Sequence, residues 1–161
     1  MSNLYRPQYA FETPRGFRDE TFHYSFDKTN VAALGVLLPT LQLRNDIILQ
    51  FQNDQEFVCR AIRVLGAVTE QGGGTPVSNL YIWLKDPFGN YLSQTYVPIS
   101  RYLTGAGAGI IGRLPVIIEP EIICPAGGMW AMYLYNPTTG SLLPPSITFF
   151  GDKRYPLEPA A

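Results

Sequence analysis

Charged side chains are scarce in this sequence of 161 residues. Asp, Glu, Lys and Arg make up 16% of it, below the usual quarter. The 12 basic and 13 acidic residues leave a formal net charge of −1, so the sequence lacks the positive excess of proteins that coat nucleic acid or membrane surfaces. Apolar residues make up 46%, enough to build a core. With few charges left for the surface, we expect partner proteins to cover part of it.

Residues for nucleophilic and metal chemistry are also few. His23 is the only histidine and lies between Phe22 and Tyr24, on the outward side of an expected strand. A Ser–His–Asp or Cys–His mechanism would have to use it, and zinc sites need several Cys or His ligands at close spacing. Cys59 and Cys124 are far apart and lie in apolar runs, so we expect buried free thiols, with a disulfide as the alternative.

The residue counts leave one enzymatic mechanism possible, which is catalysis by a pair of carboxylates that face one cleft. Glu119 and Glu121 flank Pro120 and could share one side of a strand. Acidic residues beside proline in a β protein are usually solvated, which is the interpretation that we prefer. We therefore predict no catalytic residues, no metal site and no cofactor.

Long apolar runs are absent as well. No stretch approaches the roughly 20 apolar residues of a membrane-spanning helix. The N-terminal 18 residues are polar and contain arginine, unlike a signal peptide. We expect a protein that is made in a reducing cytoplasm and does not enter membranes.

Glycine and proline are abundant, with 15 and 14 residues spread along the chain, and such punctuation excludes long helices. Aromatic residues at 13% favour strands. The fold class predicted is all-β, an antiparallel, jelly-roll-like β-sandwich of about eight to ten short strands with an extended N-terminal arm. The expected strands cover residues 22–26, 34–38, 47–52, 57–67, 80–84, 91–97, 116–118, 121–124, 129–135 and 147–150.

Residues 54–66 fit two patterns. Asp54 to Glu56 followed by spaced apolar residues fits a capped amphipathic helix that ends at Gly66. The β-branched Val58, Ile62 and Val64 favour a strand, which we prefer because the surrounding chain is β.

The two tryptophans, Trp83 and Trp130, are candidates for stacking on sugar rings. Both lie in apolar strand patterns, so we predict that both belong to the core.

Three segments are expected: an arm at 1–20, a sandwich domain at 21–156 and a tail at 157–161. The arm combines proline, aromatic residues and arginine, which suits docking along a neighbouring protein, although it could also fold back on its own domain. Arginine outnumbers lysine nine to three, and arginine is favoured at interfaces. If Arg60 and Arg63 are buried they need partners, which a neighbouring subunit could supply. The candidate partner-binding residues of the arm are Tyr5, Arg6, Tyr9, Phe11, Arg15, Phe17 and Arg18.

The order of these signals resembles small β-sandwich structural proteins of tailed-bacteriophage particles. The final strand, which ends in Gly151-Asp152-Lys153-Arg154-Tyr155-Pro156, resembles that group most. The other resembling pieces are residues 34–39, 53–57, 80–92, 120–128 and 133–136.

The resemblance implies a non-enzymatic virion protein with no active site. It would be a head-decoration (cement) protein that binds the major capsid protein and bridges capsid subunits, or a neck or tail component. The expected partners are virion proteins and further copies of the chain, as a dimer or trimer, with neither nucleic acid nor membrane. A carbohydrate- or receptor-binding module is the alternative from another class.

Overall fold

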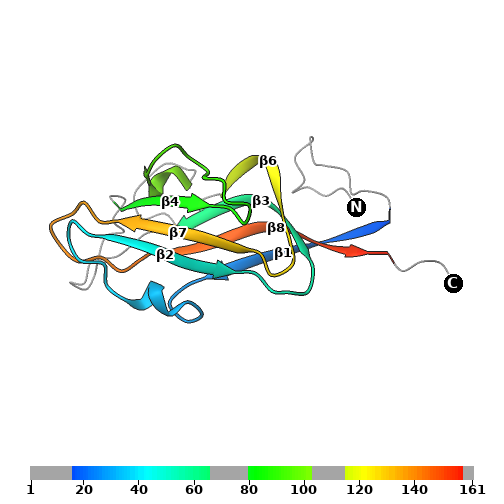
Figure 1. Cartoon of the computed structure of the whole chain (residues 1–161), viewed down its shortest axis with the longest axis horizontal. Coiled ribbons are helices and arrows are strands. Elements are labelled where there is room, and N and C mark those ends of the chain that lie inside the picture. The colour runs from blue at the N-terminus through cyan, green and yellow to red at the C-terminus, as the bar shows by residue number, and fades with distance from the viewer. Residues whose placement is uncertain (1–15, 66–79, 103–114, 158–161) are drawn as a thin grey trace.

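The computed structural model describes residues 16–65, 80–102 and 115–157. Within these ranges the chain forms eight strands and two short 3₁₀ helices (Figure 1). In chain order the elements are β1 (Phe17–Phe26), η1 (Ala32–Gly35), β2 (Leu43–Gln50), β3 (Glu56–Leu65), β4 (Tyr81–Lys85), β5 (Val97–Pro98), η2 (Ile99–Tyr102), β6 (Val116–Cys124), β7 (Met129–Tyr135) and β8 (Ser146–Pro156).

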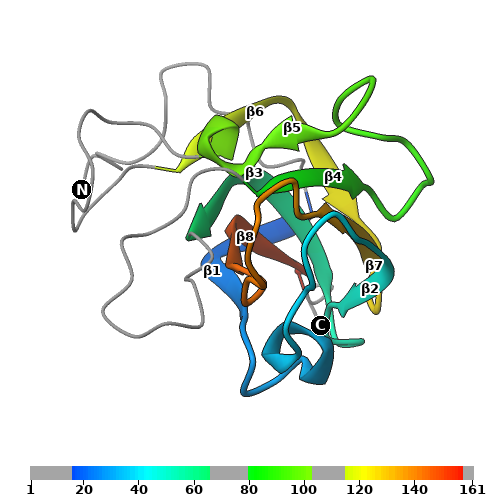
Figure 2. The same cartoon turned by 90° about the vertical axis from the view of Figure 1, so that its left-hand side faces the viewer.

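The strands form two antiparallel sheets that pack face to face (Figure 2). The order in the first, here called the β1 sheet, is β1-β8-β3-β6, and in the second, the β2 sheet, it is β2-β7-β4-β5. Consecutive strands therefore lie in different sheets, except β4 and β5, which are neighbours in the β2 sheet. This is the winding of an eight-stranded jelly roll. The predicted all-β sandwich is confirmed.

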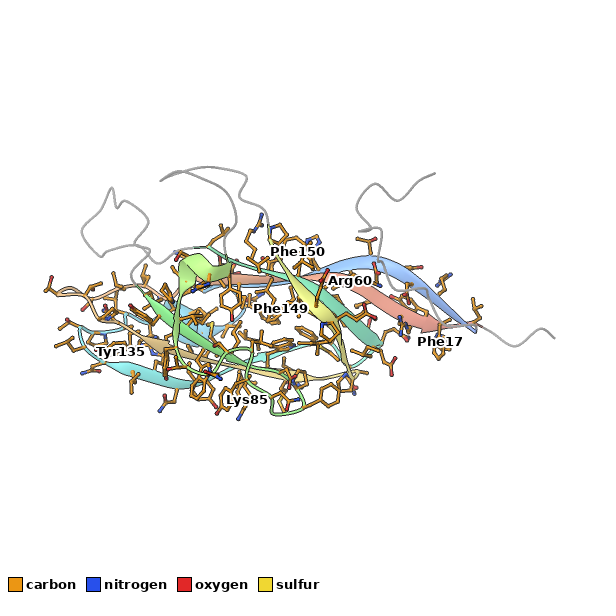
Figure 3. All side chains as sticks on the ribbon, turned by 90° about the horizontal axis from the view of Figure 1, so that it is seen from above. Phe17, Arg60, Lys85, Tyr135, Phe149 and Phe150 are labelled. Carbon is orange, nitrogen blue, oxygen red and sulfur yellow. The ribbon has the colours of Figure 1, made fainter. Side chains whose placement is uncertain are left out.

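The core lies between the sheets and is rich in aromatic rings. Tyr24 stacks on Phe51 with ring centroids 4.2 Å apart, and Trp130 contacts Phe149 at 4.7 Å. Alternation along β8 places Phe149 between the sheets and Phe150 on the outer side, as Figure 3 shows. Burial of these large rings supplies most of the driving force for packing the two layers.

The ambiguous segment at 54–66 is a strand, as preferred. β3 pairs with β8 on one side and with β6 on the other, so it is a central strand of its sheet. Its residues are largely buried, because one face meets the core and the other is covered by side chains of neighbouring strands.

Two expected strands are irregular in the structure. Residues 34–38 form part of η1 and one isolated bridge, from Leu38 to Leu142. The Arg44 guanidinium donates hydrogen bonds to the carbonyl oxygens of Ala33, Val36 and Leu37. These oxygens therefore do not accept hydrogen bonds from a neighbouring strand. Residues 91–97 form a loop, apart from a bridge between Tyr91 and Lys85 and the start of β5 at Val97.

Three predicted boundaries were wrong. β6 runs through Pro120 without a break, which an edge strand tolerates. β8 continues past Gly151 to Pro156, and β1 begins at Phe17 and pairs there with Pro156. The last four residues of the expected arm therefore belong to the sandwich, while residues 1–15 and 158–161 lie outside the described part. Figures 1 and 3 show the β1–β8 ladder reaching beyond the other strands.

Candidate interaction surfaces

The outer face of the β2 sheet is aromatic. Alternation along β4 turns Tyr81, Trp83 and Lys85 outward, and the β7 residues paired with the first two of them are Tyr135 and Tyr133. Solvated faces of antiparallel sheets normally carry polar residues. An outward row of tyrosine and tryptophan departs from that pattern.

The loop between β4 and β5 folds across this face. The Tyr91 ring stacks on Trp83 at 3.9 Å with an interplanar angle of 17°, and the Trp83 Nε1–H donates to the Ser93 carbonyl oxygen at 2.8 Å. The turn that begins the loop is closed by Asp86, whose carboxylate accepts from the backbone N–H groups of Phe88 and Asn90. These contacts explain why 91–97 is a loop rather than a strand.

Apolar side chains extend the aromatic row toward the β2 edge. Leu43 and Ile48 of β2, Met129 of β7 and Tyr91 are each more than two fifths exposed. Lys85 lies among the rings, with its Nζ 5.7 Å from the Tyr91 centroid and 5.8 Å from that of Tyr133. We call Leu43, Ile48, Trp83, Tyr91, Met129 and Tyr133 the aromatic face.

The outer face of the β1 sheet has the opposite chemistry, an ion network that joins all four strands. The bulge in β3 at Arg60 directs this side chain toward Asp152 of β8, with Nη2 3.0 Å from Oδ2, and toward Glu121 of β6 at 3.4 Å. Arg154 of β8 donates to Asp19 of β1 at 3.0 Å. Arg60 is also 4.0 Å from Asp19, which connects the two groups of ions.

The network is largely hidden from solvent. The side chains of Asp19, Arg154 and Glu121 are 0%, 6% and 11% exposed. The hydrogen bond to Asp19 raises the pKa of Arg154, and desolvation raises the pKa of Glu121 despite the attraction of Arg60. Each carboxylate has an arginine partner, so these ion pairs connect neighbouring strands and have a structural role. Arg60 does need partners, as predicted for a buried arginine, and the chain itself supplies them in Asp152 and Glu121, where a neighbouring subunit was considered as a source.

A buried lysine closes one end of the sandwich. Lys153 Nζ donates to Gln52 and to Asp54, both at 2.7 Å, and lies 4.1 Å from the centroid of the Phe22 ring. Burial is the largest single effect and lowers the pKa of Lys153, but the hydrogen bond to Asp54 and the charge interactions with Tyr24, Asp54 and Tyr155 together outweigh it, so the net shift is upward. The same hydrogen bond lowers the pKa of Asp54.

This pair predicts a dependence of stability on pH. Because the folded state holds the pKa of Asp54 below that of the unfolded chain, the pair stabilises above the unfolded value, and that contribution is lost as pH falls through the folded pKa. We expect Asp54→Asn to lower Tm at about pH 6 and to lower it less at about pH 2.5, measured by circular dichroism. In a Lys153→Met background, the effect of Asp54→Asn should be the same at both pH values. A pH-independent effect of the single substitution would contradict the pairing.

The residues predicted for the arm fall in two groups. Phe17 and Arg18 lie in β1, where Arg18 pairs with Glu20 at 3.1 Å and sits over the Tyr155 ring at 5.2 Å. The remaining candidates lie outside the described residues: Tyr5, Arg6, Tyr9, Phe11 and Arg15. The structure thus does not test their part in partner binding.

The other candidate residues occupy separate places. Cys59 and Cys124 are buried free thiols, as predicted, and burial raises the pKa of Cys124 to about 12. His23 is exposed on the outer side of β1, and Glu119 is exposed whereas Glu121 faces Arg60. The structure does not bring the histidine, the thiols and this pair of carboxylates into one site. In the described ranges no group of three or more His, Cys, Asp or Glu residues could hold a metal ion.

One prediction about the tryptophans was correct and one was wrong. Trp130 is fully buried in the core, but Trp83 lies half-buried on the outer face. The sequence analysis did not predict the aromatic face, although the sequence contains a signal for it. Tyr81 and Trp83, and again Tyr133 and Tyr135, alternate with aliphatic residues. If the aliphatic residues face the core, the aromatic residues lie on the outer face of the sheet.

Among the described residues, no helix has both the length and the apolar character that crossing a membrane requires. No family model, curated protein or solved structure matches this chain.

Proposed function

We propose that this chain is a non-enzymatic structural protein of a virus particle, a decoration (cement) protein that binds the capsid and bridges its subunits. The observation that carries the proposal is the contrast between the two outer faces. The β1 sheet pairs acidic and basic side chains on its outer face, with Ile117 and Ile123 of β6 also exposed, while the outer face of the β2 sheet carries a row of aromatic side chains.

The aromatic face has the composition of a protein-binding surface. Interfaces are enriched in Tyr, Trp and Met and depleted in Lys and acidic residues. β7 carries no charged residue, and the one charged residue of β4, Lys85, lies over aromatic rings. Large exposed apolar patches of this kind mark interaction sites in soluble proteins.

The jelly roll supports the proposal in a weaker way. Capsid proteins use this fold, and so do lectins and many enzymes, so the fold by itself does not assign a function. It supplies a rigid scaffold on which many weak contacts, repeated by the symmetry of a shell, add up to strong attachment.

Binding to particles that lack the chain tests the proposal. We expect the double variant Tyr91→Ser with Met129→Ser to bind such particles at least about tenfold more weakly than wild type, because two exposed apolar contacts are lost. The matched control is Ile117→Ser with Ile123→Ser, which removes similarly exposed side chains from β6 of the other sheet. Co-sedimentation gives the affinities. Equal losses in both variants would contradict a role specific to the aromatic face.

Carbohydrate binding is the second candidate, favoured by the exposed ring of Tyr91 above Trp83. Sugar-binding platforms need rings that offer a common plane. Here the Trp83 ring is covered on one side by Tyr91, and it is tilted by 54° to Tyr133 and by 44° to Tyr96. The tilts favour a contoured protein partner. A glycan array with wild type and Trp83→Ala separates the two: binding that Trp83→Ala abolishes would favour the carbohydrate function.

A further inference from the structure

The two sheets have four edge strands, and three of them carry features that block pairing with another strand. β1 begins with three consecutive charged residues after Phe17, namely Arg18–Glu20. β5 has two residues and ends in Pro98. β6 contains Pro120 between Glu119 and Glu121. Charge, proline and shortness are the usual means by which edges avoid pairing.

The edge of β2 differs. The first half of β2 holds Arg44, Asp46 and a bulge between Arg44 and Ile47. The second half, Ile47–Gln50, has neither charge nor proline, and the side chain of Ile48 there is exposed, as is that of Leu43 at the start of the strand. Among the described residues the structure pairs β2 with β7 alone.

The hydrogen-bond pattern shows which groups this edge offers. The Phe51 N–H donates to Gly128 of the β7 side at 2.9 Å, and hydrogen-bonded positions alternate along an antiparallel pair. The backbone N–H and C=O groups of Ile47 and Leu49 therefore point toward β7. Those of Ile48 and Gln50 point toward the open edge, where they can form hydrogen bonds with a further strand.

We propose that the β2 edge pairs antiparallel with the β2 edge of a second copy of this chain, forming a two-fold dimer with a continuous eight-stranded sheet. When a strand pairs antiparallel with its own copy, both subunits use the same surface. The interface is then complete in a dimer and no third subunit can add to it. The register that matches open groups to open groups places Ile48 opposite Gln50 of the second copy.

Charge and area both favour a second copy as the occupant. Ile47–Gln50 is uncharged, so self-pairing over these residues opposes no like charges, and a net charge of −1 gives little repulsion between copies. A stable interface needs about 800 Å² per partner, more than a strand backbone offers. The exposed side chains of Leu43 and Ile48 in β2, and of Leu41 just before it in the chain, offer further apolar area.

Sedimentation equilibrium of the full chain over a range of concentrations tests the dimer. The variant Gln50→Pro removes one edge-facing N–H without removing a hydrogen bond to β7, and proline is tolerated on edges in this orientation. We expect wild type and the control Gln50→Ala to dimerise, and Gln50→Pro to raise the dissociation constant at least about tenfold. Ile48→Lys, which brings like charges close to the two-fold axis, should do the same and serves if the proline variant does not fold.

Amide hydrogen exchange gives an independent readout. The Ile48 and Gln50 amides should become protected as the dimer forms, while those of Ile47 and Leu49 are protected in the monomer as well. A monomer at every concentration, or a dimer that both Gln50→Pro and Ile48→Lys leave intact, would overturn the proposal. The dimer goes beyond the proposed function and is measured without particles, whereas the particle-binding test alters Tyr91 and Met129. Failure of one is therefore distinguishable from failure of the other.

Discussion

Replacing Gly151 by alanine should destabilise this protein more than any other change of a single methyl group. A Cβ at Gly151 lies 1.8 Å from the Val58 carbonyl oxygen and 3.1 Å from the Phe57 ring. The obstacle is the backbone of β3, next to the bulge at Arg60, in the middle of the sheet. Because backbone atoms there cannot move without breaking the ladder, we expect a loss of more than about 3 kcal/mol in the free energy of unfolding.

Gly140→Ala is the matched control, because a Cβ at Gly140 meets no atom within 4 Å. Its effect should stay within about 0.5 kcal/mol. Urea unfolding of both variants, followed by circular dichroism, gives the comparison. If Gly151→Ala and Gly140→Ala unfold at the same denaturant concentration, the close approach of β8 to β3 is wrong.

Removal of the Arg60 guanidinium should give the second large effect. Arg60→Met keeps the apolar stem but leaves the carboxylates of Asp152 and Glu121 without their main partner, at 9% and 11% exposure. Removing one member of a buried ion pair costs about 3–5 kcal/mol, because the remaining charge is desolvated and uncompensated. Thermal unfolding at neutral pH should therefore show a markedly lower Tm.

An exposed ion pair of the same sheet provides the control. Arg18 and Glu20 are 3.1 Å apart, with side chains 60% and 51% exposed. Arg18→Met should change stability by less than about 1 kcal/mol, since solvent screens such pairs. Similar effects of Arg60→Met and Arg18→Met would mean that the network on the β1 sheet contributes little.

Local pattern was enough to predict the fold class. Short apolar segments separated by glycine and proline predicted the strands, and β-branched residues in 57–65 correctly outweighed the helix-like spacing there. Burial of Cys59, Cys124 and Trp130 followed from their apolar neighbours. These features depend on nearby residues, which the sequence displays directly.

Features that depend on distant residues could not be predicted. Trp83 and Trp130 both lie in apolar strand segments, and the alternation that separates them shows two faces without showing which one the opposite sheet will cover. The Tyr91 ring that stacks on Trp83 comes from a loop whose path the local pattern does not give. The ion network requires the β3 bulge to turn Arg60 toward Asp152, a residue 92 positions away. The start of β1 at Phe17 depends on pairing with Pro156, at the other end of the chain.

The difference between the outer faces connects the structure with the proposed function. Ion pairs among its own side chains join all four strands of the β1 sheet, which stiffens that layer. The β2 sheet offers an aromatic face and an open edge in the same layer. One layer thus stabilises the scaffold while the other is available for contacts with proteins.

The central claim, that this chain works by attaching to a virus particle, is tested most directly by its copy number in purified particles. Particles from the source of the gene would be banded in a density gradient, and the chain would be quantified against the major capsid protein by mass spectrometry. The account predicts a fixed ratio to the capsid protein that survives repeated banding. Absence of the chain from the particles, or an amount that declines with each round of purification, would contradict it.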